Sequence, residues 1–309
     1  ETASKRSAGK EIAFMGKTYT VEEATFDSFK GMDIALFAGG SISKDFAPHA
    51  VKAGAVVIDN SSAFRMDPEV PLVVPEVNPQ AILKHKGIIA NPNCSTIIMV
   101  MALKPIYDLA KIKRVIVSTY QAVSGAGKEG IDELDAQVRE HSEGREMTAN
   151  ILPSASAEKH YPIAFNLIPQ IDVFCDNLYT KEEMKMVNET KKIMEDYEMR
   201  ITATTIRVPV YRSHSESVNI ELEKEVDLGA MREALAKFPG VTVQDDPSKQ
   251  EYPMPLYTSE KDDVYVGRLR RDESCEKSYN MWVVGDQIRK GAALNTLQIA
   301  ETMIKNGWI

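Results

Sequence analysis

Short apolar segments alternate with helical segments in the first third of the chain, and each apolar segment ends in small polar residues. Residues 33–37 (DIALF) lead into Ala-Gly-Gly-Ser, and residues 55–58 (AVVI) lead into Asp-Asn-Ser-Ser. A helical stretch at 43–53 separates these two strands, and residues 72–74 and 88–90 continue the series. This α/β alternation predicts a parallel sheet that is covered on both faces. Ligands bind at the carboxyl edge of such sheets, so the Gly, Asn and Ser turns are expected at a ligand site.

The rest of the chain has a different order of elements, which predicts a second domain of the α+β class. Its strands are rich in β-branched residues, and its helices do not alternate regularly with them. The helix that begins near Thr180 is expected to be amphipathic, with Met184, Val187 and Met194 on its apolar face. The expected elements are strands at 113–121, 201–208 and 217–222 and helices at 129–141, 180–196 and 291–306.

Length, charge and cysteine content narrow the class of protein. The 309 residues are enough for two domains. A net charge of −8 provides no basic field for nucleic acid. No apolar segment approaches the roughly 18 residues that cross a bilayer, and residues 1–10 do not resemble a signal peptide. We therefore expect a cytoplasmic protein without membrane or nucleic-acid partners. Cys94, Cys175 and Cys275 are far apart, so neither a disulfide framework nor a metal site is expected.

The segment NPNCST at 91–96 is the most informative motif. Pro92 ends the preceding extended segment, and residues 97–103 form an apolar helical sequence. Cys94 is therefore expected at the first turn of a helix, where backbone N–H groups and the helix dipole stabilise a thiolate. A thiolate attacks acyl carbons readily. A lone cysteine would more simply be a buried structural side chain, but the flanking Asn and Ser-Thr residues favour a chemical role.

This motif and several others resemble those of the aspartate-semialdehyde dehydrogenases. The matches follow one another in the family's order over nearly the whole chain, from Ser4 to Glu301. The resemblance implies a Rossmann-type dinucleotide-binding domain and an α+β catalytic and dimerisation domain. It also implies the NADPH-dependent reduction of an acyl phosphate that is first bound covalently by Cys94. Besides NPNCST, the matching segments are GGSISKDFAP, IDNSSAFRMD, VPEVN, TYQAVSGAG, KHYPIAFN, IPQIDVF, RVPVYRSHSESVN, VGRLR and DQIRKGAALNTLQIAE.

Three further residues are expected to complete the catalytic group. Arg207 and His214 are seven residues apart with Pro209 between them, so we expect a strand, a loop and a second strand that aim both side chains at one cleft. Histidine titrates near neutrality and can serve a thiol as base and acid. The resemblance implies that His214 deprotonates Cys94 and later handles protons. It also implies that Arg207 binds the substrate's α-carboxylate and that Gln121 orients the substrate.

The remaining substrate contacts are also implied by the resemblance. Glu182 and Lys185 are three residues apart on one helix, which alone would indicate a solvated ion pair. In the family, the matching residues bind the substrate's amino group and its phosphate, respectively. Arg65 and Asn93 match the other phosphate contacts. Arg65, Lys185 and Arg207 are therefore expected to form a local cationic pocket in an otherwise acidic protein.

The cofactor residues are predicted from two parts of the chain. Hydroxyls and a cation at residues 4–7 favour the 2′-phosphate of NADP over the free ribose of NAD, although Glu1 places an acid nearby. No glycine-rich dinucleotide turn precedes residue 33. The resemblance implies that this turn lies before Glu1, about 30 residues or one opening βαβ segment earlier. The expected cofactor contacts are Ser4, Arg6, Ser7, Ser124, Gly125 and Asn295.

The sequence therefore predicts two domains and one reaction. Residues 1–93 and 288–309 are expected to form the dinucleotide-binding domain, and residues 94–287 the catalytic and dimerisation domain of a homodimer. The expected reaction converts the small-molecule acyl phosphate 4-phospho-L-aspartate to L-aspartate 4-semialdehyde and phosphate. Its product leads toward lysine (through diaminopimelate), methionine and threonine.

Three alternatives were weighed against this prediction. N-acetyl-glutamyl-phosphate reductases perform the same chemistry on a longer acyl phosphate, but their nucleophile motif resembles NPGCY, where this chain has Asn93 and Ser95. Glyceraldehyde-3-phosphate dehydrogenases share the thioester chemistry but typically read SCTTN. The third alternative is an inactive truncated homologue. The retention of all the expected catalytic residues argues against it.

Overall fold

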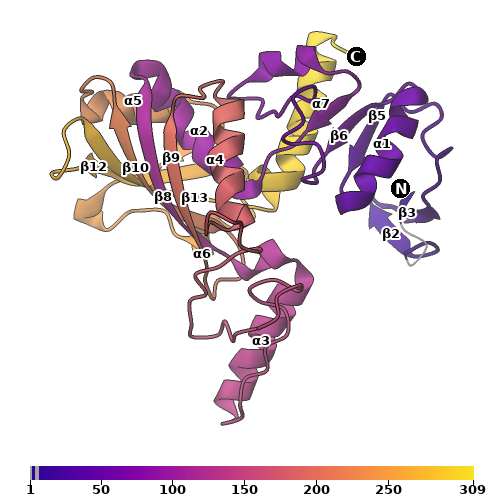
Figure 1. Cartoon of the computed structure of the whole chain (residues 1–309), viewed down its shortest axis with the longest axis horizontal. Helices are drawn as coiled ribbons and strands as arrows, with labels where there is room; N and C mark the ends of the chain where they lie inside the picture. The colour runs from indigo at the N-terminus through magenta and orange to yellow at the C-terminus, as the bar shows by residue number, and fades with distance from the viewer. Residues whose placement is uncertain (1, 4–6) are drawn as a thin grey trace.

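The computed structural model describes residues 2–3 and 7–309, with side chains from residue 7 onward. Its two larger sheets, of three and six strands, lie in different parts of the body (Figure 1). The chain passes from the first part to the second through α2 (Cys94–Leu109), and it returns through a π-helical turn at Arg289–Ala293. The site residues described below gather around these two crossings.

The three-stranded sheet has the predicted parallel, alternating arrangement. β5 (Ile34–Phe37), β6 (Val56–Asp59) and β7 (Ile88–Ala90) are parallel neighbours in this order. One face packs against α1 (Ser43–Lys52), and the other packs against α7 (Leu294–Asn306). Because helices cover both faces, the strands are apolar in nearly every position, as the sequence indicates. The predicted α/β class is confirmed.

Residues 72–74 do not form the strand that their apolar sequence predicts. Leu72 makes only an isolated bridge to Ala90, and the backbone is otherwise irregular. Pro71 and Pro75 bound this segment and have no N–H to donate to a neighbouring strand, so a longer ladder cannot form. The segment still packs beside β7 and contributes to the main core.

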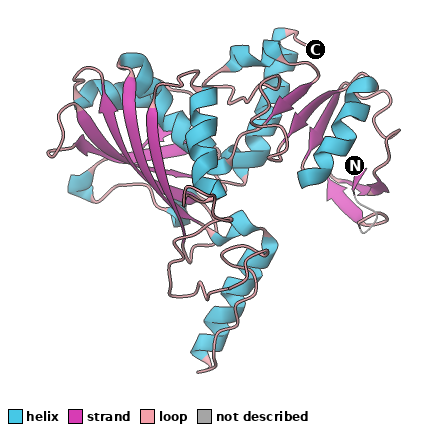
Figure 2. Cartoon of the chain, viewed as in Figure 1, coloured by secondary structure: helices cyan, strands magenta, loops and turns pink. Residues whose placement is uncertain are grey.

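The six-stranded sheet forms the centre of the second part. Its strand order is β11-β12-β13-β10-β8-β9, which places strands that are distant in the sequence side by side. One face is buried against α2 and two further helices, and the core lies between them (Figure 2). The predicted mixed, α+β character is confirmed. The elements are β8 (Ile112–Gln121), α4 (Lys181–Ile193), β9 (Arg200–Arg207), β10 (His214–Leu222), α5 (Leu228–Lys237), β11 (Val241–Val243), α6 (Pro255–Thr258), β12 (Val264–Arg271) and β13 (Ser278–Gly285).

Helix α2 is the central helix of the structure. Its residues from Ser95 to Leu103 are all buried, because the helix is apolar around its whole circumference. Helix α3 (Lys128–Ser142) behaves differently and projects from the body together with the long irregular segment that follows it (Figure 1). Short elements complete the fold: β1 (Thr2–Ala3), β2 (Glu11–Phe14), β3 (Lys17–Thr20), β4 (Glu22–Glu23) and 3₁₀ turns at Gly40–Ile42, Pro79–Lys84, Val123–Ala126 and Pro247–Lys249.

The helices can also be compared with the length and hydropathy that a membrane-spanning helix needs. Within the residues described above, none of the helices combines the length and the apolar character needed to cross a bilayer.

Candidate active site

Cys94 is the first residue of α2, as its motif predicts. Asn93 precedes it as the N-cap, and the Asn93 Oδ1 atom accepts hydrogen bonds from the N–H groups of Ser95 (3.1 Å) and Thr96 (3.2 Å). This cap satisfies two of the free donors at the start of the helix. Gly291, in the π-helical turn, lies so close that a Cβ there would be 3.0 Å from the Cβ of Cys94. The nucleophile therefore lies where both chain crossings meet.

The helix start favours a Cys94 thiolate, as expected, through the Ser95 N–H, but the surroundings oppose it more strongly. Burial and, next, the nearby Glu182 carboxylate raise the pKa of the Cys94 thiol to about 12. Arg65, the Ser95 N–H and Arg207 lower it, but they do not outweigh the loss of solvent and the negative neighbour. In this arrangement Cys94 is a thiol at neutral pH. Its activation requires a change in the charge beside it.

Gln121, Arg207 and His214 lie at the same end of three neighbouring strands of the six-stranded sheet. Gln121 ends β8 and is paired with Arg207, which ends β9. His214 begins β10, whose next residue, Ser215, is paired with Tyr120 of β8. The expected strand, loop and strand are present, and β8 lies between the two strands rather than letting them pair. The sheet register therefore brings the three side chains together.

His214 is buried, and its two ring nitrogens have different environments. The backbone N–H of Ala122 donates to Nδ1 at 3.1 Å. Because Nδ1 accepts, a neutral ring carries its hydrogen on Nε2, which has no partner among the described residues. Burial, and next the positive charge of Arg207, hold the pKa of His214 well below its usual range. The ring is thus neutral and set to donate a hydrogen bond from Nε2.

Arg207 is buried beside His214 and has free donors. Its Nη1 donates to the Ala122 carbonyl at 2.6 Å, whereas its buried Nε has no protein acceptor among the residues described. A Cβ on Gly125 would lie 2.6 Å from Arg207 Nη1 and 3.1 Å from the His214 ring, so only glycine leaves room at that position. An unpaired buried guanidinium N–H is costly without an acceptor. This arrangement suits a bound carboxylate.

A polar network joins Glu182 to the nucleophile. Its Oε1 accepts from Asn93 Nδ2 at 2.9 Å and from Gln121 Nε2 at 3.3 Å. Its Oε2 accepts from Lys185 Nζ at 3.1 Å, and Lys185 is also bound to Asp172 at 3.0 Å. Burial raises the pKa of Glu182, but Lys185 and Asn93 outweigh it, so this pKa is lowered and the carboxylate stays charged. Glu182 and Lys185 are therefore not a solvated pair.

Helix α4 buries acids together with apolar side chains. Glu182, Glu183 and Glu189 are all buried, whereas Met184 and Val187 are only half-buried. The prediction holds for Met194, which is buried in the main core, but not for Met184 and Val187. The buried face lies further round the helix, where the glutamates find partners inside the protein. The Glu183 side chain closes a capping box with Thr180 and also accepts from the Thr205 N–H, which gives it a structural role.

Arg65 is held from three sides by the protein. Its Nε donates to the Asn91 carbonyl at 2.9 Å, its Nη2 to the Asn60 carbonyl at 3.1 Å, and its Nη1 to Glu189 at 3.3 Å. Arginine has five N–H groups, so one on each terminal nitrogen remains for an anion. The expected cationic pocket is corrected in one respect: carboxylates lie beside Arg65 and Lys185, so the site is close to electrically balanced.

The predicted cofactor contacts divide into three groups. Ser4 and Arg6 lie outside the described residues, and Ser7 is in a half-buried turn. Ser124 and Gly125 adjoin the catalytic group, and the Ser124 hydroxyl accepts from Gln287 Nε2. Asn295 is buried and its amide is engaged within the protein: it donates to the Val73 carbonyl at 3.0 Å and to Asn91 Oδ1 at 2.7 Å, and it accepts from Lys290 at 2.9 Å.

Comparison with known proteins agrees with this geometry. Residues 1–85 match the family described as semialdehyde dehydrogenase, NAD binding domain, and residues 103–290 match its dimerisation domain. Aspartate-semialdehyde dehydrogenase from Aquifex aeolicus is 57% identical over 99% of this chain and 90% of its own length. The chain belongs to the aspartate-semialdehyde dehydrogenase family. The family predicted from the segments is confirmed, and a dinucleotide is its cofactor.

Two further relatives strengthen the assignment. The Bacillus subtilis aspartate-semialdehyde dehydrogenase is 54% identical over 98% of this chain and 88% of its own length. The crystal structure of aspartate semialdehyde dehydrogenase II from Vibrio cholerae, described as complexed with ASA, is 46% identical. It superposes with a TM-score of 0.91 over 98% of this chain and 89% of that chain. The predicted two-part fold of the family is likewise confirmed.

Sequence reasoning missed three buried polar residues of this family member. Glu189, Gln287 and Lys290 connect site segments, but none lies in a recognisable spacing with the nucleophile. One signal was available for Glu189, because it is seven residues after Glu182 and two helical turns place both on one face. Gln287 and Lys290 were inside a matched segment, but their contacts to Ser213 and Glu76 span more than 70 residues of sequence.

Glu216 is a buried carboxylate that the catalytic network does not use. It lies on β10 between Thr119 of β8 and Val283 of β13, on the same face as His214. Neither of its oxygens has a partner among the residues that the structure describes, and burial holds its pKa well above the usual range. Such a group stays protonated in the folded protein, whereas it ionises in the unfolded chain.

We expect Glu216→Gln to stabilise the protein, and more so at higher pH. As the pH rises above about 4.3, the unfolded chain loses a proton that the folded state retains, so wild-type stability falls. Glutamine cannot ionise and avoids this loss, by about 1–3 kcal/mol near pH 7. Thermal unfolding at pH 5.5 and pH 8 should give a larger gain at pH 8. Glu221→Gln, on the outer face of the same strand, is the control; an equal gain at both pH values would contradict the prediction.

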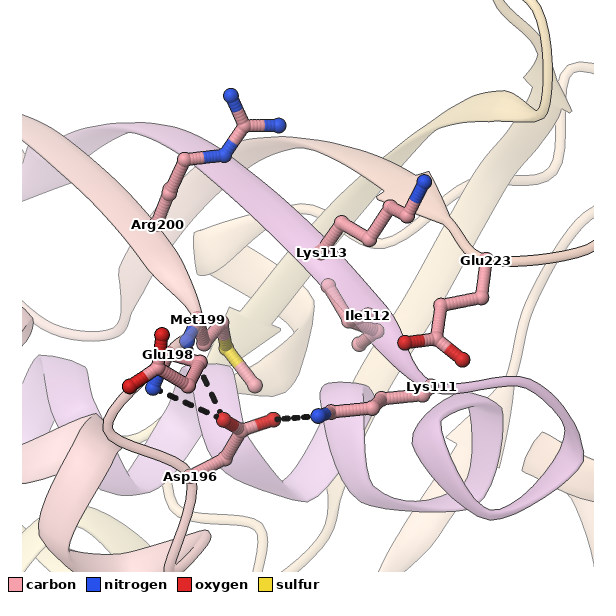
Figure 3. A pocket seen from close by; sticks show the side chains of 8 residues that line it. All are labelled: Lys111, Ile112, Lys113, Asp196, Glu198, Met199, Arg200 and Glu223. Atoms are coloured by element: carbon pink, nitrogen blue, oxygen red, sulfur yellow. Dashed lines mark hydrogen bonds and ion pairs between the residues drawn. The ribbon is translucent and has the colours of Figure 1, made fainter.

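A surface cavity of about 210 Å³ lies far from these residues. It is lined by the beginning of β8 near Ile112, whereas Gln121 ends that strand about 30 Å away. Figure 3 shows that Asp196, the central acid of the cavity, is already bound to Lys111 at 3.6 Å and to two backbone N–H groups. The cavity lies at the opposite end of β8 from Gln121, so it has no part in the chemistry of the site.

Proposed function

We propose that this protein catalyses the NADPH-dependent reduction of 4-phospho-L-aspartate to L-aspartate 4-semialdehyde and phosphate. The observation that carries the proposal is that Arg207, whose charge acts on the Cys94 thiol, lies next to Gln121 and His214. A site that combines a thiol, an imidazole and a free guanidinium is suited to acyl transfer from an anionic substrate. The family to which the chain belongs supports the same reaction.

The proposed binding mode uses each charged group once. The unpaired Nε of Arg207 binds the α-carboxylate, and Glu182 binds the α-ammonium. The phosphate binds to the free N–H groups of Arg65 together with Lys185 and Asn93. An ammonium at Glu182 cancels the negative charge that raises the pKa of Cys94. Substrate binding therefore brings the thiol closer to ionisation.

The proposed reaction then proceeds in two steps on Cys94. The sulfur forms a bond to the acyl carbon, the bond between that carbon and the phosphate oxygen breaks, and phosphate leaves with the electron pair. When bound, NADPH supplies the hydride that adds to the thioester carbon. The carbon–sulfur bond then breaks, which gives the aldehyde and restores the sulfur. His214 Nε2 donates to the oxygen as charge develops there. For Nε2 to take the Cys94 proton, the ring must first carry its hydrogen on Nδ1, which requires the Ala122 N–H to leave Nδ1.

The dinucleotide fits the carboxyl edge of the three-stranded sheet. The turn after β5 contains Gly39 and Gly40, which are exposed, and Gly40 has a left-handed φ of +63° with open space around it. Such a turn lets a backbone approach a bound group closely. We propose NADP as this cofactor, with Ser4, Arg6 and Ser7 at the 2′-phosphate and the Ser124–Gly125 turn near the nicotinamide. Asn295 would act through the position of Asn91, since its amide is already engaged.

The same proposal covers the domains, the assembly and the location. Residues 1–93 with 288–309 would bind the dinucleotide, and residues 94–287 would carry catalysis and join two subunits in a homodimer. The matched dimerisation domain, at 103–290, supports self-association through the second part of the chain. We place the enzyme in the cytoplasm, where its phosphorylated substrate and its cofactor would be available.

The deciding experiment compares two substrates and two cofactors, and it uses the protein in its natural form. Reduction of 4-phospho-L-aspartate and of N-acetyl-L-glutamyl phosphate should be followed with NADPH and with NADH. We expect turnover of the aspartyl phosphate with NADPH to exceed the three other combinations by at least about a hundredfold in kcat/KM, a difference of about 2.7 kcal/mol. Preference for the glutamyl substrate, or no turnover of either, would overturn the proposal.

A further inference from the structure

Glu189, on α4, contacts two site segments at once. Its Oε2 accepts the backbone N–H of Asn93 at 2.6 Å, and its Oε1 accepts from Arg65 Nη1 at 3.3 Å. Glu189 is 1% exposed, so these two hydrogen bonds, rather than water, stabilise its negative charge. The segments that it joins come from different strands of the three-stranded sheet, because Arg65 follows β6 and Asn93 follows β7. A single carboxylate thus links the phosphate arginine to the loop of the nucleophile.

Lys192 holds the Arg65 segment from the next turn of the same helix. Its Nζ donates to the backbone carbonyls of Arg65 at 2.8 Å, Asp67 at 2.7 Å and Val70 at 2.8 Å. Three carbonyls around one ammonium fix the backbone of this loop, while Glu189 fixes the arginine side chain. We call Glu189 and Lys192, with their contacts to residues 65–70 and Asn93, the α4 clamp.

The contact to Asn93 also determines which backbone donor remains beside the nucleophile. The N–H groups of Ser95 and Thr96 are directed at the Asn93 side chain, and Glu189 takes the N–H of Asn93 itself. Within the described part of the chain, the N–H of Cys94 has no acceptor. Of the backbone donors at residues 93–96, the N–H of Cys94 is therefore the one left for a bound substrate.

The same contact sets the direction of Arg65. Asn60, Asn91 and Glu189 each take one of its N–H groups, and the two that remain are on neighbouring nitrogens of the planar fork. Donors on these two adjacent nitrogens can bind two oxygens of one phosphate. Without Glu189 the fork would be free to turn, and this match would be lost.

We propose that Glu189 is a positioning residue that aligns the phosphate-binding fork of Arg65 with Cys94. It touches neither substrate nor cofactor. It acts through Arg65 and through the backbone of Asn93, the residue before Cys94. The inference deepens the proposed function and rests on it, because it takes Arg65 as a phosphate ligand. A purely structural role would lower stability without a selective effect on phosphate.

The test uses the reverse reaction, in which phosphate and the semialdehyde are separate substrates. Glu189→Gln keeps the shape, but its amide can accept from only one of the two donors and repels the other. We expect the KM for phosphate to rise about tenfold and kcat to fall by about ten- to a hundredfold, while the KM for L-aspartate 4-semialdehyde stays within about twofold. An unchanged KM for phosphate would overturn the proposal.

A double-mutant cycle with Arg65→Ala decides whether Glu189 acts through the arginine. If it does, Glu189→Gln raises the KM for phosphate no further in the Arg65→Ala background. Full additivity of the two effects would sink the idea. Glu195→Gln, which removes an exposed ion pair with Lys84 just beyond α4, is the matched control and should leave all constants unchanged.

Lys192→Gln provides an independent check if Glu189→Gln does not fold. It loosens the Arg65 segment without touching Asn93, and it should raise the KM for phosphate by about threefold. A KM at the wild-type value would overturn the α4 clamp. The failure of the proposed function would look different: wild type itself would then show no phosphate-dependent oxidation of the semialdehyde.

Discussion

Cys94→Ser should lower the turnover of acyl phosphate by about 10³- to 10⁶-fold, the loss typical when a covalent nucleophile is removed. Serine fits the same space at the start of α2, so folding should be preserved. Its hydroxyl ionises far less readily than a thiol, and the burial that raises the pKa of Cys94 to about 12 would disfavour an alkoxide more strongly. The rate is measured as NADPH oxidation at saturating substrate, with thermal unfolding to verify the fold.

Cys275→Ser is the control for this experiment, because Cys275 is exposed and remote from the site residues. It should retain full activity. Alkylation with iodoacetamide followed by peptide mass spectrometry adds a second measurement. Bound substrate should change the labelling of Cys94 and leave that of Cys275 unaffected. Near-normal turnover in Cys94→Ser would remove the covalent mechanism from consideration.

His214→Gln should reduce kcat by about 10²- to 10⁴-fold, the usual contribution of a positioned proton donor or acceptor. The Gln amide can replace a hydrogen bond, but it cannot transfer a proton. The KM for the semialdehyde should change little, because Arg207 and Glu182 provide the binding contacts. A fall in kcat of less than about threefold would contradict a role of His214 in proton transfer.

The lowered pKa of His214 gives this experiment a pH signature. Since burial and Arg207 keep the folded ring neutral, wild-type kcat should not show a histidine limb near pH 6.5. Below about pH 6.5, the unfolded chain takes up a proton that the folded ring refuses, so wild-type stability falls as the pH decreases. His214→Gln lacks this loss, and its unfolding temperature should depend less on pH between 6.5 and 5. An acid limb near pH 6.5 that disappears in the variant would contradict the neutral ring.

The fold was largely predictable because its signals are local. Apolar segments that end in Gly, Asn or Ser indicated the strands and their ligand edge, and the structure has β5, β6 and β7 at those places. The failure at 72–74 has an equally local cause, since two prolines prevent a ladder. The start of α2 at Cys94 followed from Asn93 as a cap, which needs only three residues of sequence.

The features of the site that could not be predicted from the sequence depend on contacts between distant segments. The spacing of Arg207 and His214 predicted a common cleft but not the strand that lies between them. Sheet register, with Gln121 paired to Arg207, arises from the packing of the whole sheet. The charge state of Cys94 also depends on Glu182, 88 residues away, whose carboxylate opposes the helix start. Sequence motifs identify the reacting groups, whereas the charge states of these groups can be derived only from the folded structure.

The acidic inner face of α4 has a consequence for protein engineering. A sequence chosen for stability alone would replace Glu182 and Glu189 with apolar residues, because a packed hydrophobic helix avoids the desolvation of buried charge. The natural sequence retains both acids, so part of its attainable thermostability has been given up to keep the site charged. Consensus or computational redesign of this helix should therefore be constrained at these two positions. The exposed Asn188 and Lys181 on the same helix are the places where stabilising substitutions can be made freely.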